Sequence, residues 1–575
     1  MFSLHDPIDD ALREALGSYD DLIADLLVRR GITSASEADA FLSPSYDAHI
    51  HDPMLMLDMP RAVERVVRAL DTKERITIWS DYDCDGIPGG VLLHDFFKKA
   101  GANFTNYIPH RHLEGYGMNV AGIEKLAQEG TTLIVTVDSG ITDVEAVTRA
   151  NELGMDVIVT DHHLPQEVLP PAYAILNPNA RPEETYPYRS LCGAGVAWKL
   201  VSAVLQHGFV GRDTIPIGWE KWLLDMAGLA TIADMVPLTG ENRVIAKYGL
   251  LVMRKSPRLG FQKLAKVARV NQRFITEDDV GFMIAPRVNA ASRMGDPWDA
   301  FRLFTTEDEA EADRLSKLLE SINRSRRSVA GATTRAVHER LDRIREEGRE
   351  IPSVIVMGDP EWRPGLLGLV ASGIADEYER PVFLWGREGN DTLKGSCRGG
   401  PGKVHVVKLM QAAEEGTFVE FGGHAASAGF AVAADAVHLL ETRLTHALEA
   451  LAHEDETEEE RADLHLTPET VTHAVLALFD KLAPFGMGNP RPLVALHDVS
   501  ITEVAWFGKQ GEHLRIRVAR EFEGSIEAIA FYARRELGKD VDRLAAGSRA
   551  HLLVHVERDQ FTRGQPVRLR LVSVR

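Results

Sequence analysis

"RITIWSDYDCDG", residues 75–86, joins a short run of β-branched and aromatic residues to three aspartates at alternate positions. The first half is typical of a buried β-strand, and the second half resembles the opening of an EF-hand calcium loop. A calcium loop needs a preceding helix and a bidentate Glu at its twelfth position, where this chain has Leu92. The calcium interpretation therefore fails, and the stretch predicts a strand that ends in carboxylates.

Strand-like and helix-like runs alternate along the chain after this stretch. Further strand-like runs occupy 103–108, 131–137 and 155–160, and helix-like runs that end in Gly lie between them. Strands that alternate with helices predict a parallel sheet wrapped by helices.

The remainder of the chain predicts additional units of a multidomain α/β protein. A long Ala-, Glu-, Arg- and Leu-rich helix is expected over 300–348, a second α/β unit begins at 351, and short alternating strands toward the C-terminus predict a small OB-like β-barrel. The expected boundaries are an N-terminal helical segment at 1–50, the first α/β domain at 51–300, the connecting helix at 301–350, the second, smaller α/β domain at 351–455, a linker or helical segment at 456–489 and the barrel at 490–575.

The composition is that of a globular protein, with 45% hydrophobic and 26% charged residues. No stretch approaches the roughly 20 apolar residues of a membrane span, so no membrane association is expected, and the acidic N-terminus does not resemble a signal peptide. The three cysteines lie far apart without paired spacing, which favours a reducing, cytoplasmic location and argues against a cysteine-based zinc site.

The formal net charge of −20 argues against nucleic-acid binding by the surface as a whole. Local patches decide binding, however, and residues 323–345 carry seven Arg against two acidic residues. This patch is either a nucleic-acid contact or a solvated helix face.

Acidic residues and imidazoles follow several of the apolar runs. Asp138 follows 131–137, Asp161, His162 and His163 follow 155–160, and Asp234 follows another apolar run that we interpret as a further strand. Ligands of doubly wound sheets bind beyond the carboxyl ends of the strands, so these groups are expected to meet at one edge. Each aspartate alone could instead be a turn or helix cap.

Carboxylates packed together repel one another unless cations lie between them. An oxygen-rich site with one or two imidazoles suits Mn²⁺ or Mg²⁺, and the imidazoles favour Mn²⁺. Two such ions form the clamp that many enzymes use to cleave phosphoesters. Cys84, inside the aspartate triplet, is expected to point away from the ions and pack.

The motifs "DYDCDG", "VDSG", "DHH" and "ATIAD" resemble, in order and spacing, those of the DHH phosphoesterase superfamily. The later "GSCRG" (395–399) and "FGGHAASAGF" (421–430) resemble its companion DHHA1 domain. The long helix, "CGAGVAWKL", "APRVNAASRMG", "FGMGNPRP" and the β-rich tail resemble the bacterial branch that degrades single-stranded DNA. The resemblance implies a metal-dependent 5′→3′ exonuclease that hydrolyses single-stranded DNA to mononucleotides in DNA repair and recombination.

The resemblance also implies roles for individual residues. The residues expected to hold two ions, Mn²⁺ or alternatively Mg²⁺, are Asp81, Asp83, Asp85, Asp138, His162 and Asp234, with Asp138 as the bridge. The expected catalytic residues are His163, facing the scissile phosphate, Asp83, and Arg293, gripping a phosphate. The expected substrate-binding residues are Arg111, Ser396 and Arg398 at the 5′-phosphate, Gly422, Gly423 and His424 at the backbone, and Trp506 as a base-stacking residue of the barrel.

Three alternative functions remain open at this stage. The chain could be a related enzyme that cleaves cyclic dinucleotides or short oligonucleotides. It could also be a pyrophosphatase of the same superfamily, or a non-catalytic DNA-binding scaffold on the same fold. The long helix and barrel argue against the first, "GSCRG" and the extra length against the second, and the complete set of expected metal ligands against the third. For the exonuclease, the expected partners are single-stranded DNA, a single-strand-binding protein and a helicase.

Overall fold

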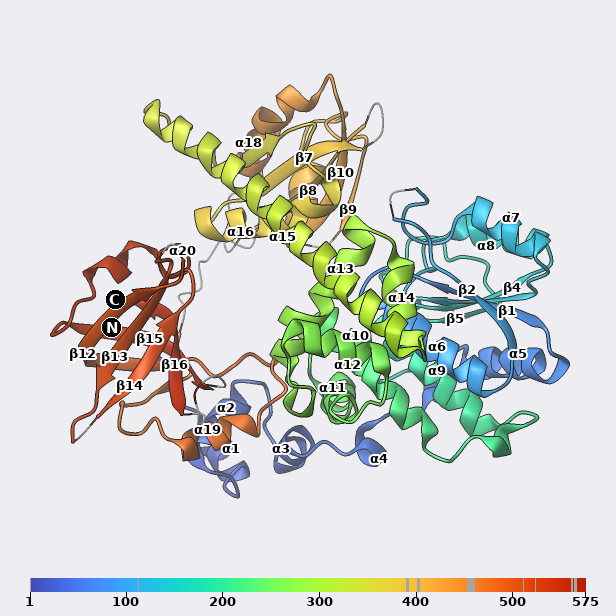
Figure 1. Cartoon of the computed structure of the whole chain (residues 1–575), viewed down its shortest axis with the longest axis horizontal. Coiled ribbons are helices and arrows are strands. Elements are labelled where there is room, and N and C mark those ends of the chain that lie inside the picture. The colour runs from blue at the N-terminus through green and yellow to red at the C-terminus, as the bar shows by residue number, and fades with distance from the viewer. Residues whose placement is uncertain are drawn as a thin grey trace.

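The structure, a computed structural model, describes residues 2–575 except 112, 389–391, 401–403, 424, 452–460, 510, 523, 560–561 and 563–565. Its three β-sheets belong to three units (Figure 1). Within the described ranges, every helix is too short or too polar to cross a bilayer.

The first sheet is parallel throughout and has the strand order β2-β1-β3-β4-β5. Its strands are β1 (Arg75–Ser80), β2 (Asn103–Tyr107), β3 (Leu133–Val137), β4 (Asp156–Thr160) and β5 (Ala174–Leu176). Its helices are α5 (Met59–Thr72), α6 (Gly86–Lys99), α7 (Val120–Gln128), α8 (Val144–Glu152) and α9 (Gly193–His207). The stretch follows a strand, and α6 begins at Gly86, inside what would be the twelve-residue loop, which confirms that it is not an EF-hand.

Helices cover both faces of this sheet, which explains why its central strands are apolar throughout. Ile76 and Ile78 of β1 share one buried cluster with α5, α6 and α9. Trp79 shares another cluster with Ile134 of β3 and with α7 and α8. Side chains that alternate along a strand therefore enter two different cores.

A helical layer follows the sheet and leads into one long helix. Its members are α10 (Leu224–Ala233), α11 (Gly240–Met253), α12 (Leu259–Ala268), α13 (Ala285–Met294), α14 (Pro297–Thr305) and α15 (Glu309–Glu346). The 38 residues of α15 extend about 57 Å. Leu315 and Leu319 near its start are buried in the core of the first unit, and Val337 and Leu341 near its end are buried in the second. This helix therefore joins the two units.

The second unit contains a mixed sheet with the order β6-β7-β8-β10-β9. Only β6 and β7 pair in parallel, and the other described neighbours are antiparallel. The strands are β6 (Ile355–Gly358), β7 (Val382–Glu388), β8 (Thr392–Arg398), β9 (Glu420–Gly423) and β10 (Ser427–Ala433), and the helices are α16 (Pro364–Tyr378), α17 (Val406–Ala412) and α18 (Leu440–Leu451).

The C-terminal unit is a barrel that closes through the pairing of β12 with β15. Its strands are β11 (Leu464–His465), β12 (Val494–Phe507), β13 (His513–Ala519), β14 (Ser525–Ala530), β15 (Arg549–Arg558) and β16 (Val567–Val574), and its helices are α19 (His473–Asp480) and α20 (Ala533–Glu536). The predicted fold class, two α/β units with a connecting helix and an OB-like barrel, is confirmed.

The N-terminal helices pack against this barrel, which lies far away in the sequence. They are α1 (Asp10–Ala15), α2 (Asp21–Val28) and α3 (Ala35–Leu42). The short helix α4 (Tyr46–His49) instead packs against the first unit, where Tyr46 lies beside Trp198 and Tyr248. Leu26 and Leu27 of α2 are buried in one core with Val494 and Leu552 of the barrel. Figure 1 accordingly places the two chain ends beside each other.

Short helical turns complete the chain. The 3₁₀ turns are η1 (Pro53–Leu55), η2 (Arg212–Thr214), η3 (Trp219–Leu223), η4 (Gln272–Phe274), η6 (Val437–Leu439) and η7 (Gly538–Arg543), and η5 (Asp279–Ile284) is a π-helical turn that runs into α13.

Candidate active site

The aspartate triplet turns the chain from β1 into α6. Asp83 accepts hydrogen bonds through Oδ1 from the backbone N–H groups of Asp85 (2.7 Å) and Gly86 (3.2 Å). Gly86 is required here, because a Cβ would lie 2.5 Å from the carbonyl group of Asp81. The turn directs Asp81 and Asp85 into the interior, where both are buried.

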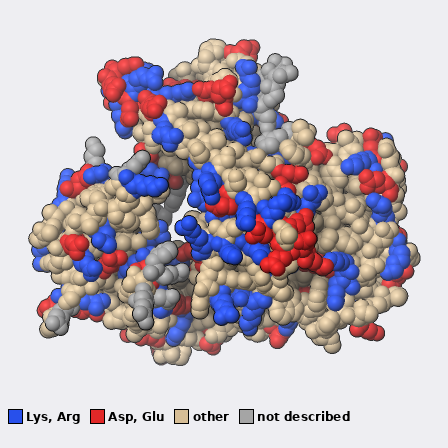
Figure 2. All heavy atoms as spheres, viewed as in Figure 1, with Lys and Arg blue, Asp and Glu red and all other residues tan. Residues whose placement is uncertain are grey.

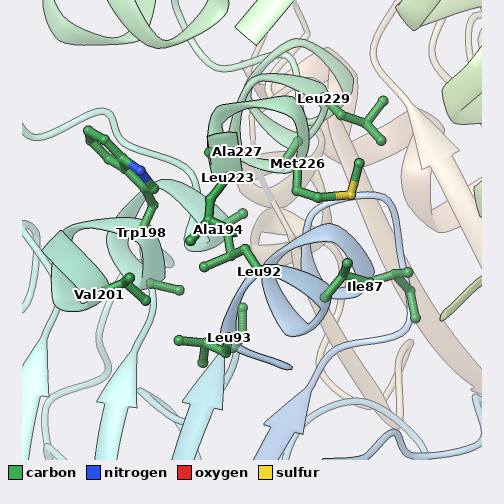
Figure 3. Packing of buried hydrophobic residues seen from close by; sticks show 14 of the residues in the cluster. Ile87, Leu92, Leu93, Ala194, Trp198, Val201, Leu223, Met226, Ala227 and Leu229 are labelled. Atoms are coloured by element: carbon green, nitrogen blue, oxygen red, sulfur yellow. The ribbon is translucent and has the colours of Figure 1, made fainter. Parts of the chain in front are cut away.

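Asp85 is held by the start of a second helix. Its carboxylate accepts from the backbone N–H groups of Gly193 (2.6 Å) and Ala194 (2.8 Å) in the first turn of α9. Free N–H groups at a helix N-terminus are suited to bind an anion. The packing of α6, α9 and α10 fixes this arrangement, and Figure 3 shows apolar side chains such as Leu92, Ala194 and Ala227 from the three helices in contact range.

Asp138, directly after β3, has a left-handed backbone conformation with φ 59°. Such conformations are uncommon outside glycine, although Asp and Asn adopt them more readily than most residues. The side chain is buried against Gly193, at which a Cβ would lie 2.6 Å from the Asp138 Cβ. Close approach of α9 to Asp138 therefore depends on this glycine.

We expect Gly193→Ala to weaken Mn²⁺ binding and cleavage without removing any ligand. The added methyl group must displace Asp138 or α9, at a strain of about 1–3 kcal/mol, which corresponds to about ten- to hundredfold in metal affinity. Metal titration and strand-cleavage rates measure the effect. Gly195→Ala is the matched control, because its Cβ would contact Cys192 Sγ at an ordinary 3.6 Å; equal effects of the two substitutions would contradict the prediction.

Asp161 organises the histidine loop after β4. Its carboxylate accepts from the backbone N–H groups of Ile141, His162 and His163 and lies 2.8 Å from His163 Nδ1. Both Asp161 carboxylate oxygens therefore accept hydrogen bonds from protein groups, which agrees with its absence from the expected metal ligands. Burial alone would raise the pKa of Asp161, but His163 and these donors hold it below its usual value.

Further side chains support the loop, and the sequence analysis did not identify them. Asn177 and Asn179 donate to the backbone carbonyls of His163 and His162. Tyr116 donates to the Asp138 carbonyl (3.1 Å), with its hydroxyl 3.2 Å from His163 Nδ1. The sequence did not predict that "NPN" (177–179) lies next to the histidines, because β5 and the loop before it separate the two segments along the chain.

Asp234 reaches the same edge from a helix, so its interpretation as a strand end is wrong. It is the C-cap of α10, and the next residue, Met235, has φ 61°. The run "GLATIA" is apolar because α10 is buried on all sides between α6, α9 and α11. Buried helices and buried strands both have continuous apolar sequences, which explains the misassignment.

The expected metal ligands are brought together in two groups, Asp81–Asp83–Asp138 and Asp85–His162–Asp234, each with ligand atoms within 4.8 Å of one another. His162 Nε2 joins the groups, since it lies 3.1 Å from Asp138 Oδ1 and 3.7 Å from Asp85 Oδ2. Asp81 Oδ1 and Asp138 Oδ1 are buried without a hydrogen-bond donor in the described part of the chain. Buried carboxylate oxygens without donors, together with one imidazole, fit hard divalent cations.

The electrostatics of the metal-free site show the same requirement for cations. Burial, followed by the charges of the neighbouring aspartates, raises the pKa of Asp81 and Asp138 well above the ordinary value. The same causes raise the pKa of Asp234 to about 9. Burial opposes the protonation of His163, but Asp161 outweighs it and raises the His163 pKa to about 9. Without metals, protons therefore reduce the repulsion.

The thermal stability of the metal-free protein is expected to fall between about pH 6 and about pH 9. Asp234 and His163 both have folded-state pKa values near 9, above their ordinary values of 3.8 and 6.5. The folded state thus binds more protons than the unfolded chain, so its stability is lost as pH rises through the folded pKa. Unfolding temperatures in EDTA across this range provide the measurement.

Excess Mn²⁺ should stabilise the protein more at the alkaline end of this range, because metal then replaces fewer protons. Asp234→Asn should flatten the decline in EDTA. A melting temperature in EDTA that is constant or rises with pH would refute the prediction that the folded, metal-free protein binds protons at Asp234 and His163.

Arginines line the space beside the carboxylates. Burial, then the charges of Arg111 and Arg326, lowers the pKa of Arg293 to about 10, while Asp83 opposes the shift and Arg398 adds to it. Arg293 Nη1 also donates to the carbonyl of Gly365 (3.0 Å), at the start of α16. The candidate phosphate-binding residues Arg111, Arg293 and Arg398 are therefore near one another, although they belong to two units.

Ser396 and Arg398 lie on β8 and contact each other. Arg398 Nη1 donates to Ser396 Oγ (3.1 Å) and to the Cys397 carbonyl (2.7 Å). A Cβ at Gly368 on α16 would lie 2.7 Å from Arg398 Nη2, so this glycine leaves room for the guanidinium. Among the described residues no carboxylate forms an ion pair with Arg398.

Gly422 and Gly423 lie in the exposed strand β9, next to β10. Gly423 has φ 148°, and a Cβ there would lie 2.5 Å from the Ala428 Cα. His424 lies outside the described residues.

Trp506 belongs to the barrel, on the opposite side of the molecule from β1–β5 in Figure 1. It is half-buried against the barrel core, and the Arg534 guanidinium covers its ring at 4.2 Å. Its neighbour Phe507 is the exposed member of the pair and contacts His513 and Phe531.

Comparisons with known proteins place each unit. Residues 75–231 match the DHH family, N-terminal domain, residues 352–454 the DHHA1 domain and residues 462–573 the RecJ OB domain. The single-stranded-DNA-specific exonuclease RecJ of Escherichia coli is 33% identical over 83% of this chain and 83% of its own length. The chain belongs to the RecJ family of single-stranded-DNA-specific exonucleases.

Two other RecJ proteins extend this finding. RecJ of Haemophilus influenzae is 31% identical over 85% of this chain and 86% of its own length. RecJ of Bacillus subtilis is 35% identical over 89% of this chain, which spans 63% of that relative's length.

The RecJ fold is also seen in solved structures. RecJ of Thermus thermophilus in complex with Mn²⁺ superposes with a TM-score of 0.81 at 28% identity, covering 100% of this chain and 78% of that one. The complex of the same protein with Mg²⁺ has a TM-score of 0.74 at 26% identity, covering 100% and 77%.

Proposed function

We propose that the chain hydrolyses single-stranded DNA from its 5′ end to mononucleotides with two divalent ions, preferably Mn²⁺, and acts in DNA repair and recombination. The observation that carries this proposal is the pair of adjacent ligand groups that share the neighbourhood of Asp138, with arginines beside them. Membership in the RecJ family supports the same activity.

The protein residues have separate tasks in this proposal. The carboxylates of both groups and His162 would hold the ions, which supply activation of water and neutralisation of phosphate charge. His163, kept in place by Asp161, faces the same space and can donate a proton or a hydrogen bond to the phosphate. Arg293 would bind a phosphate oxygen, and its hydrogen bond to the Gly365 carbonyl of α16 holds it where the two units meet.

The 5′-terminal phosphate would bind Arg398, Ser396 and Arg111. A bidentate guanidinium suits a terminal phosphate, and a terminal phosphomonoester carries more charge than an internal diester. Gly422 and Gly423 would allow the strand backbone to approach β9 closely. Recognition of the end would set the direction of degradation.

Incubation with end-labelled single- and double-stranded DNA and RNA, with and without Mn²⁺, tests the function. We expect mononucleotides from 5′-phosphorylated single strands only when metal is present. Products released first from the 3′ end, or equal degradation of duplex, would exclude the proposal.

The supply of substrate suggests the partners. A blunt duplex offers no free strand, so a helicase would expose the 5′-ended strand, and a single-strand-binding protein would cover it. We also propose a cytoplasmic location, supported by Cys84, Cys192 and Cys397, which are buried and not joined in disulfides.

Phe507→Ala combined with Tyr532→Ala is expected to weaken binding of long strands about tenfold or more while leaving the rate at saturating DNA unchanged. Both aromatic side chains are exposed around His513, and stacking contributes about 1–3 kcal/mol per base. Point substitutions are preferable to deletion of the barrel, which would expose the core it shares with α2.

Phe522→Ala is the control, since Phe522 is exposed beyond the other end of β13. Anisotropy of labelled strands compares the variants. Weakening by Phe522→Ala alone would place the stacking surface at that other end.

A further inference from the structure

The middle of α15 borders a groove with an excess of positive charge. The groove encloses about 530 Å³ between α12, η5, α13 and α15. Its charged lining residues are Arg269, Arg287, Lys317, Glu320, Arg324 and Arg327. Figure 2 shows basic side chains gathered on this face around the middle of α15. In a chain of net charge −20, such a concentration marks a local site for an anion.

The charges of the groove are only partly neutralised within the protein. Glu320 pairs with the buried Arg287 (2.7 Å) and lies 3.5 Å from Arg324, whose side chain is 78% exposed. Lys317 pairs with Asp313, one turn earlier on α15. Arg269 and Arg327 are exposed, and no ion pair joins either of them to another described residue. Three guanidinium groups therefore face solvent with little compensation.

Further arginines of α13 and α15 lie near the groove and influence one another electrostatically. Arg327 is next to Arg326 on α15, and the charges of Arg327 and Arg287, after burial, lower the pKa of Arg326. Arg326 in turn lies close enough to Arg293 to lower its pKa. Arg293 and Arg287 are six residues apart on α13 and face different sides of that helix, and α13 packs against α15, which carries Arg326 and Arg327.

We propose that this groove binds backbone phosphates of the substrate strand on the 3′ side of the cut, away from the metal-ligand groups. The assignment rests on the proposed function, in which Arg398 holds the 5′ end, so that the nucleotides beyond the metal-ligand groups belong to the uncut strand. Exposed guanidinium groups bind phosphates without regard to base sequence, as an exonuclease that degrades any sequence requires.

The test compares R324Q/R327Q with the matched control R335Q/R343Q. Both pairs neutralise two exposed arginines of α15, but Arg335 and Arg343 lie outside the groove. Affinities for 5′-phosphorylated single strands of about 30 and about 5 nucleotides are measured without divalent metal over a range of salt concentrations. Each lost phosphate contact should reduce the slope of log K against log salt by about 0.7.

We expect R324Q/R327Q to reduce that slope by about 1.4 for the long strand, while the short strand and the control pair keep wild-type values. Equal salt slopes for R324Q/R327Q and R335Q/R343Q would overturn the assignment, and this is the result expected if the groove binds an acidic protein instead of DNA. An equal loss of slope for the short and the long strand would also overturn it. A wild-type protein that binds long strands with the expected slope but cleaves none would refute the proposed function and leave the groove assigned.

Discussion

Asp138→Asn is expected to lower strand cleavage by about a thousandfold, the loss associated with a main electrostatic element of an active site. The residue is a buried member of the first ligand group and lies next to the second, with Oδ1 lacking a donor in the described structure and lying 3.1 Å from His162 Nε2. An amide carries no charge for a cation, so both metal positions should weaken together. Asparagine tolerates the left-handed conformation at φ 59°, which preserves the turn after β3 better than alanine would.

The same substitution should leave the metal-free fold as stable or make it more stable, because it removes one of several mutually repelling carboxylates. Cleavage rates in excess Mn²⁺ and unfolding temperatures in EDTA measure the two effects. Asp213→Asn, at an exposed position of the first unit, is the control for net charge. Full activity in Asp138→Asn would exclude the shared-ligand arrangement.

Arg398→Ala is expected to abolish most of the preference for 5′-phosphate over 5′-hydroxyl ends. A hydrogen bond to a charged group contributes about 1.5–3 kcal/mol, so the preference should fall about ten- to hundredfold. Mn²⁺ affinity should stay unchanged, because Arg398 lies on β8 of the second unit and contacts Ser396 rather than a metal-binding carboxylate.

Rates on the two kinds of strand, below saturation, give the ratio for each protein. Arg387→Ala on the adjacent strand β7 removes an exposed guanidinium from the same sheet and serves as the control. If the unsubstituted protein treats both ends alike, or Arg398→Ala keeps its ratio, end recognition lies elsewhere.

Sequence patterns were sufficient for the carboxylates that follow strands. Asp81 and Asp138 directly follow β1 and β3, and parallel neighbours necessarily end at one edge. The pattern failed for Asp234, because an apolar run does not distinguish a buried helix from a buried strand. Asp234 was nevertheless predicted as a metal ligand, because the family resemblance assigns that role to the aspartate of "ATIAD" whatever its secondary structure.

Local order along the chain thus determined the fold class, the sheet edge and the candidate ligands, because strand and helix periodicity and strand-end residues are properties of short segments. Only the tertiary structure decided which distant groups come together. Examples are the α9 amides that donate to Asp85, the arginines of α13 and α15 that lie near one another, and α2, which is buried against the barrel. These contacts join residues up to hundreds of positions apart, and they depend on how whole elements pack, which no short segment encodes.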